Sequence, residues 1–145
     1  MTSIIRHQDW EDRLRTYLDR VKEDKFEWGT HDCALFSADC VNAMTGVDPA
    51  EVFRGTYDTA RGAAEALRTH GGGTLLRTMR QWFGEALESV HQAQRGDLVM
   101  LDRFTVGVCA GRYSWFVGRE QGQEGLTIHP TASCRHAFRV PFEAA

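Results

Sequence analysis

The hydrophobic pattern of the sequence changes near Gly96, and this change limits the fold classes open to the chain. Before Gly96, apolar residues recur mainly at the spacing of amphipathic helices. After it, short runs rich in β-branched and aromatic residues alternate with turn residues. The expected strands are Leu98–Leu101, Thr105–Ala110, Tyr113–Val117, Leu126–His129 and His136–Val140. Helices followed by closely spaced strands predict an α+β fold with an antiparallel meander of five strands.

The helices of the first half are predicted from their capping residues. Asp32 is a favoured N-cap, because its carboxylate can accept from the free N–H groups of a first helical turn. A helix starting at Cys33 then runs through an apolar segment and ends before Gly46, a residue suited to the left-handed position after a helix. The other expected helices are Trp10–Glu23 capped by Asp9, Thr59–Thr69 capped by Asp58, and a helix that is capped by Thr74 and runs to about Phe83.

Length and composition predict one soluble-type domain spanning residues 1–145. The chain has 42% hydrophobic and 26% charged residues, which is ordinary for a globular protein. A net charge of −3 argues against a broad nucleic-acid-binding surface. The sequence has no run of 18 apolar residues that would predict a membrane-spanning helix. Its first ten residues lack the apolar core of a secretory signal. We therefore expect neither nucleic acid nor membrane as a partner.

Cys33 is the strongest candidate functional residue. A thiol at the start of a helix lies in the positive end of the helix dipole, which favours the nucleophilic thiolate. The other cysteines, Cys40, Cys109 and Cys134, form no C-x-x-C motif and are expected to be reduced, small buried hydrophobes. We expect no metal and no cofactor, although a metal or cluster shared by the four cysteines is an alternative.

The motif Trp28-Gly29-x-x-Asp32-Cys33-x-x-Phe36, together with Gly96-Asp97-Leu98-Val99 and the Val106-Gly107-Val108 segment, resembles the NlpC-type cysteine peptidases. It resembles more narrowly a small family of phages and prophages with a W-G-x-x-D-C signature, found near tail genes. The resemblance covers Trp10 to about Val140. It implies a papain-like fold, in which the cysteine helix packs on a small sheet that supplies the base, and cleavage of the peptide stems of bacterial cell walls.

One departure from the resemblance concerns the catalytic base. These peptidases have a histidine at the start of the second strand, where this chain has Thr105. A threonine hydroxyl has no basic form near neutral pH that would replace imidazole. His129 on the fourth strand is the first candidate for a substitute base, and His31 is the second. His136 begins the fifth strand, and His7, His70 and His91 are expected at the surface.

Two other groups of residues carry expectations. Asp39 lies in the apolar cysteine helix, so its carboxylate needs donors, for which Arg54 or the Tyr57 hydroxyl are candidates. We interpret Asp39 as structural. Trp28, Trp115 and Phe116 can either line a cleft for a peptide stem or pack in the core.

Two functions of different classes follow from these observations. The first is a degenerate peptidase fold kept as a structural part of a phage tail tip, with tail-tip or hub proteins as partners. The second is an active peptidoglycan-cleaving cysteine endopeptidase or amidase with Cys33 as nucleophile and a relocated histidine. Either protein would be made in the bacterial cytoplasm without a signal peptide and located in the tail of the virion. Thr105 favours the first function and Cys33 favours the second.

Overall fold

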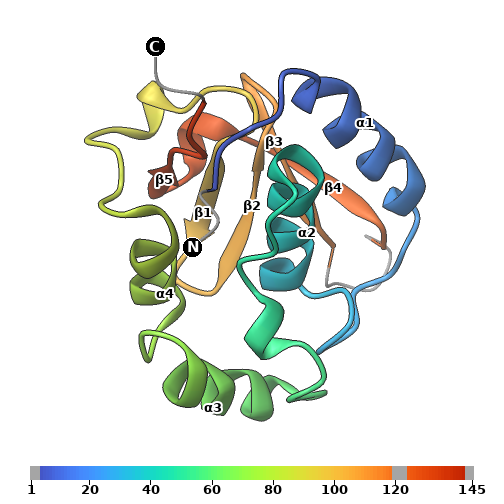
Figure 1. Cartoon of the computed structure of the whole chain (residues 1–145), viewed down its shortest axis with the longest axis vertical. Coiled ribbons are helices and arrows are strands. Elements are labelled where there is room, and N and C mark those ends of the chain that lie inside the picture. The colour runs from blue at the N-terminus through green and yellow to red at the C-terminus, as the bar shows by residue number, and fades with distance from the viewer. Residues whose placement is uncertain (1–3, 119–123, 143–145) are drawn as a thin grey trace.

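The computed structural model describes residues 4–118 and 124–142 of the chain. Helices form its first half and strands its second, so the α+β class is confirmed (Figure 1). The helices are α1 (Trp10–Val21), α2 (Cys33–Thr45), α3 (Ala60–His70) and α4 (Leu75–Phe83), with short 3₁₀ helices η1 (Glu51–Phe53), η2 (Val90–Gln92) and η3 (Thr131–Ser133). The strands are β1 (Leu98–Asp102), β2 (Thr105–Cys109), β3 (Tyr113–Val117), β4 (Leu126–Pro130) and β5 (His136–Phe138).

The five strands form one antiparallel sheet in the order β4-β3-β2-β1-β5. The predicted meander is correct for β1 to β4 but wrong for β5, which returns to the free edge of β1. Leu98 pairs with Phe138 there, and the Arg135 N–H donates to the Met100 carbonyl at 2.8 Å. This return places Phe138 and Val140 in the main core, where both are fully buried.

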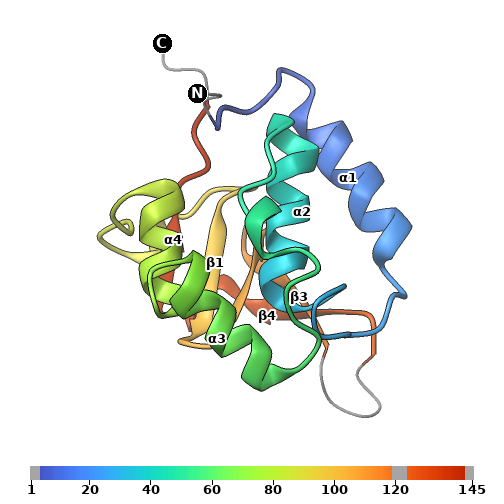
Figure 2. The ribbon, with the colours of Figure 1, turned by 60° about the horizontal axis from the view of Figure 1, so that its bottom comes forward.

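Helix α2 is the central helix of the fold. It packs against β2 on one side and α1 on another, and Figure 2 shows it between α1 and the sheet. Its buried residues lie on most of its circumference, which explains why its apolar pattern is broad. One core cluster joins Phe36, Val41 and Met44 of this helix to Val106 and Val108 of β2.

The ends of α2 agree with the sequence. Asp32 caps its start, and Gly46 follows its end in the left-handed conformation at φ 78°. Thr74 caps α4 as predicted. The predicted cap of α3 was wrong by one residue, because the Thr59 hydroxyl, which follows Asp58, accepts from the Gly62 N–H at 3.0 Å.

Asp9 precedes α1 but makes no capping hydrogen bond. Its carboxylate instead accepts from Arg13 Nε at 2.7 Å, one turn into the helix. This exposed pair adds little to stability. The start of α1 therefore depends more on the packing of Leu14 and Tyr17 in the core than on its cap.

A buried ionic cluster joins the first and last described segments to the start of the sheet. Asp97 accepts from Arg6 at 2.8 Å and from Arg139 Nε at 2.9 Å. Arg6 also donates to the carbonyls of Arg95 and Val140, so its guanidinium is well supplied with acceptors. Burial lowers the pKa of Arg6 to about 10, against the attraction of Asp97.

The guanidinium of Arg6 also lies between two aromatic rings. Its central carbon is 4.3 Å from the centre of the Trp10 ring and 4.0 Å from that of Phe142. Cation–π contact and the ion pair with Asp97 act on the same group, so the buried charge is compensated in several directions.

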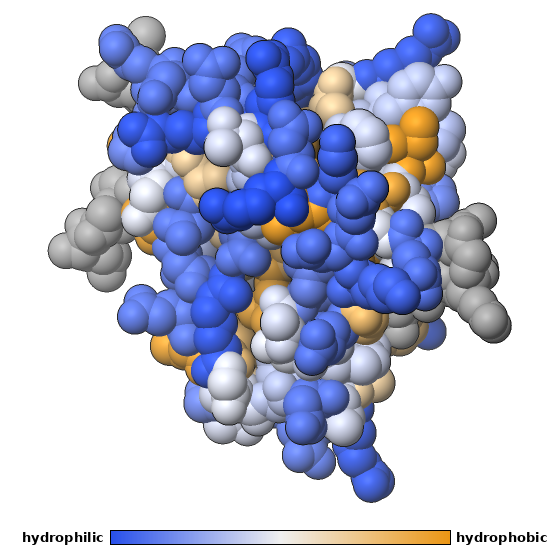
Figure 3. Space-filling view, turned by 90° about the vertical axis from the view of Figure 1, so that its right-hand side faces the viewer, coloured by the Kyte–Doolittle hydropathy of each residue, from blue (hydrophilic) through white to orange (hydrophobic). Residues whose placement is uncertain are grey.

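The surface beside α1 is mainly hydrophilic, and hydrophobic side chains show in the gaps between charged ones (Figure 3). Among residues 4–118 and 124–142, no helix combines the length and the apolar composition needed to cross a bilayer.

Candidate functional site

Cys33 is the first residue of α2, as predicted, and lies where the helix meets the turn between β1 and β2. Its side chain is buried, with 5% of the residue exposed. The thiol donates a hydrogen bond to the main-chain carbonyl of Phe104 at 3.3 Å. The hydrogen bond therefore joins the thiol, at the positive end of α2, to the main chain of the β1–β2 turn.

Asp32 positions the start of this helix. The residue is 1% exposed. Its Oδ1 accepts from the Leu35 N–H at 2.9 Å, which is the predicted N-cap bond. Its Oδ2 accepts from the Gly29 N–H at 3.0 Å and from the Tyr57 hydroxyl at 2.6 Å. With these donors in place, Asp32 acts as a structural cap and organiser of the loop.

The surroundings of the Tyr57 hydroxyl change its pKa. Burial raises the pKa of Tyr57 well above its usual value, and the hydrogen bond to the Asp32 carboxylate raises it further. The neutral hydroxyl is thus the form that the folded protein favours, and it stays a donor to Asp32 at physiological pH.

Gly29 of the W-G-x-x-D-C motif is required by a close backbone approach. It has φ 81°, and a Cβ at this position would lie 2.0 Å from the Tyr57 carbonyl oxygen. Any side chain here would push apart the two segments that hold Asp32. The motif glycine therefore has a packing role in the cysteine loop.

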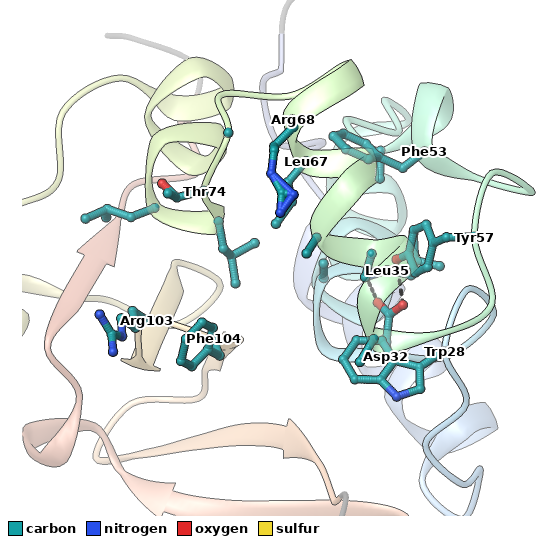
Figure 4. A pocket seen from close by; sticks show the side chains of 18 of the residues that line it. Trp28, Asp32, Leu35, Phe53, Tyr57, Leu67, Arg68, Thr74, Arg103 and Phe104 are labelled. Carbon is teal, nitrogen blue, oxygen red and sulfur yellow. Dashed lines mark hydrogen bonds between the residues drawn. The ribbon is translucent and has the colours of Figure 1, made fainter.

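A cleft of about 650 Å³ opens beside Cys33. Its walls come from α3, α4, the start of α2 and the β1–β2 turn, as Figure 4 shows. Asp32 and Ala34, the neighbours of Cys33 in sequence, line it together with Phe104. A small molecule in this cleft would lie next to the segment that carries the thiol.

Thr105, at the position of the expected histidine, begins β2 and pairs with Asp102. Val106 packs in the same core cluster as Cys33, whereas Cys109 belongs to the cluster on the other face of the sheet. Strand alternation puts Thr105 on the face of Cys109, away from α2. Thr105 therefore has no imidazole to act as a base, and it lies on the face of the sheet away from Cys33.

His129, the first candidate for a substitute base, does not lie near the start of α2. His129 pairs with Ser114 in β4, and its ring lies edge-on to Phe116 at 5.3 Å. Phe116 is buried in the cluster on the face of the sheet away from α2. The sheet therefore separates His129 from the side on which Cys33 lies.

His31 lies closer in sequence and is buried, with 8% of the residue exposed. Its ring packs edge-on to Phe36 at 5.9 Å, and its Nε2 has no hydrogen-bond partner among the described residues. A buried nitrogen without a partner is uncommon in folded proteins. Of the two histidines proposed as bases, His31 is the one on the side of α2.

The remaining histidines lie elsewhere. His7 is beside Gly46, at the opposite end of α2 from Cys33. His70 lies edge-on to Phe53 at 6.0 Å, and His91 is in η2. The predicted exposure of these three residues is confirmed. His136 begins β5, where it pairs with Met100.

The other cysteines are core residues, as predicted. Cys40, Cys109 and Cys134 are all buried. Burial raises the pKa of Cys40 well above its usual value and that of Cys134 to about 11. In the part of the chain that the structure describes, no group of three or more His, Cys, Asp or Glu residues is placed to hold a metal ion.

Asp39 has the structural partners that its burial requires. Its carboxylate accepts from Arg54 at 2.6 Å and from the Tyr17 hydroxyl at 3.2 Å. The proposed role of Arg54 is confirmed, and that of Tyr57 was wrong, since Tyr57 serves Asp32 instead. Arg54 also binds Asp48 at 2.7 Å.

The three aromatic residues proposed for a cleft have different places. Trp28 lines the cleft beside Cys33, whereas Trp115 lines a separate groove between α1 and the sheet. Phe116 is a core residue on the far face of the sheet. Sequence analysis missed the alanine face of α3 as a cleft wall, because small apolar residues on one helical face usually indicate close packing.

The comparisons with known proteins identify a family. The model of a family described as a domain of unknown function (DUF6950) matches residues 5–140, so the chain belongs to this family. No curated protein and no solved structure matches the chain.

Proposed function

We propose that this member of the DUF6950 family has an NlpC-type, papain-like fold that has lost hydrolysis and serves as a structural part of a phage or prophage tail tip. Its partners would be other tail-tip or hub proteins. The W-G-x-x-D-C motif, the cysteine at the start of α2 and the antiparallel sheet beneath that helix support the link to these peptidases.

The observation that carries the loss of hydrolysis is the state of the Cys33 thiol. It is buried and donates its proton in a hydrogen bond to the Phe104 carbonyl. A carbonyl oxygen at 3.3 Å from the sulfur favours the thiol over the thiolate, whereas attack on a peptide carbonyl needs an accessible thiolate. Thr105 adds to this argument, because general acid–base help is worth about 10²–10⁴-fold and a threonine does not supply it.

Purified protein incubated with isolated bacterial cell wall tests the proposal. We expect no stem peptides above the level released by the Cys33→Ala variant, as measured by chromatography of the soluble fraction. Cys33→Ala introduced into the virus or prophage should still give assembled tails. Clear turnover that Cys33→Ala abolishes would overturn the structural function.

A second function, that of a peptidoglycan endopeptidase or amidase, is favoured by the place of Cys33 at the start of α2 beside an open cleft. In that case His31 is the first base to test, since His129 lies on the other side of the sheet. Turnover lost in His31→Ala and kept in His129→Ala would support this enzyme.

A further inference from the structure

The cleft beside Cys33 has walls whose chemistry indicates what it binds. Small and branched apolar side chains of α3 and α4 line it together with the start of α2. The residues that make it apolar include Leu35, Phe53, Ala63, Leu67, Leu75 and Trp82. Its volume of about 650 Å³ falls within the range of small-molecule sites, roughly 300–1,000 Å³.

Apart from two arginines, the hydrogen-bonded polar side chains Asp32 and Thr74 in the wall already have partners within the protein. Both oxygens of Asp32 already accept from donors of the protein. The Thr74 hydroxyl accepts from the Arg77 N–H as a helix cap. An extended peptide would bury its amide groups against this wall without partners, which is costly for every amide desolvated. A hydrocarbon chain carries no such groups.

Two arginines line the same cleft from opposite sides. Arg68 extends from α3 and Arg103 from the β1–β2 turn, beside Phe104 (Figure 4). Both are exposed, and the ion pairs found within the described residues use other arginines. Positive charge at an apolar cleft selects a ligand with a hydrocarbon body and an anionic end.

We propose that this cleft binds a long-chain fatty acid as the free carboxylate. The alkyl chain lies along the alanine face of α3, and the carboxylate is held by Arg68. This binding needs neither hydrolysis nor the Cys33 thiolate, so it stands apart from the proposed function of the fold.

Displacement of a polarity-sensitive fluorescent fatty acid from the full chain tests the proposal. Palmitate should displace the probe saturably with one site per chain. Each methylene removed from the competitor should weaken binding about fourfold. The uncharged alcohol of the same length should bind more weakly, by about twofold to fivefold, because it leaves Arg68 without a carboxylate partner.

Two substitutions locate the site. Ala63→Trp fills the cleft and should abolish displacement by palmitate. Arg68→Glu should weaken it at least fivefold, whereas the matched control Arg61→Glu, on the same helix but outside the cleft, should leave it unchanged. Circular dichroism of each variant verifies the fold. If Ala63→Trp does not fold, the comparison of Arg68→Glu with Arg61→Glu still decides the question.

Three results would overturn the fatty-acid site. They are failure of palmitate to displace the probe below its micelle concentration, equal effects of Arg61→Glu and Arg68→Glu, and equal binding of the acid and the alcohol. Displacement by an apolar peptide as strong as that by palmitate would point to a protein partner in the cleft and would also contradict the proposal.

Discussion

Asp32 and Asp97 are both almost completely buried, and they differ in the side chains that hold them. Asp97 accepts from the main-chain N–H groups of Gln94 and Val140 and is in addition paired with the charged side chains of Arg6 and Arg139. Asp32 accepts from neutral donors, namely two main-chain N–H groups and a tyrosine hydroxyl. Asp97 joins segments that are distant in the sequence through ion pairs. Asp32 fixes the conformation of the loop before α2 through directional hydrogen bonds.

The difference between Asp97 and Asp32 separates a structural cluster, around Asp97, from the loop that positions Cys33, around Asp32. Removing one partner of a buried ion pair leaves an uncompensated charge, which is costly. Removing a cap leaves neutral donors, which cost less and affect the cysteine loop first. The comparison predicts that the cluster around Asp97 and the site beside Cys33 respond to substitution by different amounts.

The largest effect is expected for Asp97→Ala. Arg6 would stay buried without its carboxylate, so the free energy of unfolding should fall by about 3–5 kcal/mol. Urea denaturation followed by circular dichroism measures it. The double variant Arg6→Met/Asp97→Leu is the control. It should recover part of the loss, because the buried Arg6–Asp97 charges are both gone, although the N–H groups of Gln94 and Val140 still lack their acceptor. A double variant less stable than Asp97→Ala would contradict the role of charge.

A smaller loss is expected for Asp32→Ala. The substitution removes the N-cap of α2 and orphans the Tyr57 hydroxyl, for a loss of about 2–3 kcal/mol. Asp32→Asn keeps one acceptor oxygen and should lose less. If Asp32→Ala cost more than Asp97→Ala in the same urea experiment, the distinction between the two aspartates would fail.

Tyr57→Phe should cost about 1 kcal/mol, because it removes one hydrogen bond to Asp32 and leaves the other two in place. Thermal melts and urea curves at pH 8 measure the loss. Tyr113→Phe, at an exposed tyrosine on β3, is the matched control and should be neutral. Equal losses in the two variants would argue against a specific bond.

The smallest effect is a pH dependence of the Tyr57→Phe loss. The pKa of Tyr57 is raised above 10.0 by folding, so the folded state keeps a proton that the unfolded state releases above pH 10. The stabilisation by this hydroxyl is complete below pH 10 and declines above it. The difference between wild type and Tyr57→Phe should therefore shrink as the pH rises from 10 to 11, and a constant difference would contradict the shift.

Much of the fold follows from local signals in the sequence. Asp32 and Gly46 define both ends of α2, because a cap and a left-handed glycine act within a few residues. The α+β class follows from the change of period near Gly96. The place of β5 does not, since pairing with β1 depends on burial of Phe138 and Val140 over a long sequence separation.

The site was harder to predict for the same reason. The identity of Cys33 as a helix start is a local property, and it was predicted correctly. The hydrogen bond of its thiol to Phe104 joins residues 71 positions apart, and the bond from Tyr57 to Asp32 spans 25. For His129, the strand was predicted, but the face of the strand depended on the register with β3.

The hydrogen bond from Arg6 Nε to the Val140 carbonyl joins residues 134 positions apart in the sequence. During synthesis, Arg6 leaves the ribosome long before this acceptor is made. A nascent chain therefore carries this arginine without that partner until Val140 has been added. Such distant contacts also close large loops, which slows folding. Completion of the native state thus waits for Val140 to leave the ribosome, and a chain truncated before that residue would lack the hydrogen bond that closes the fold.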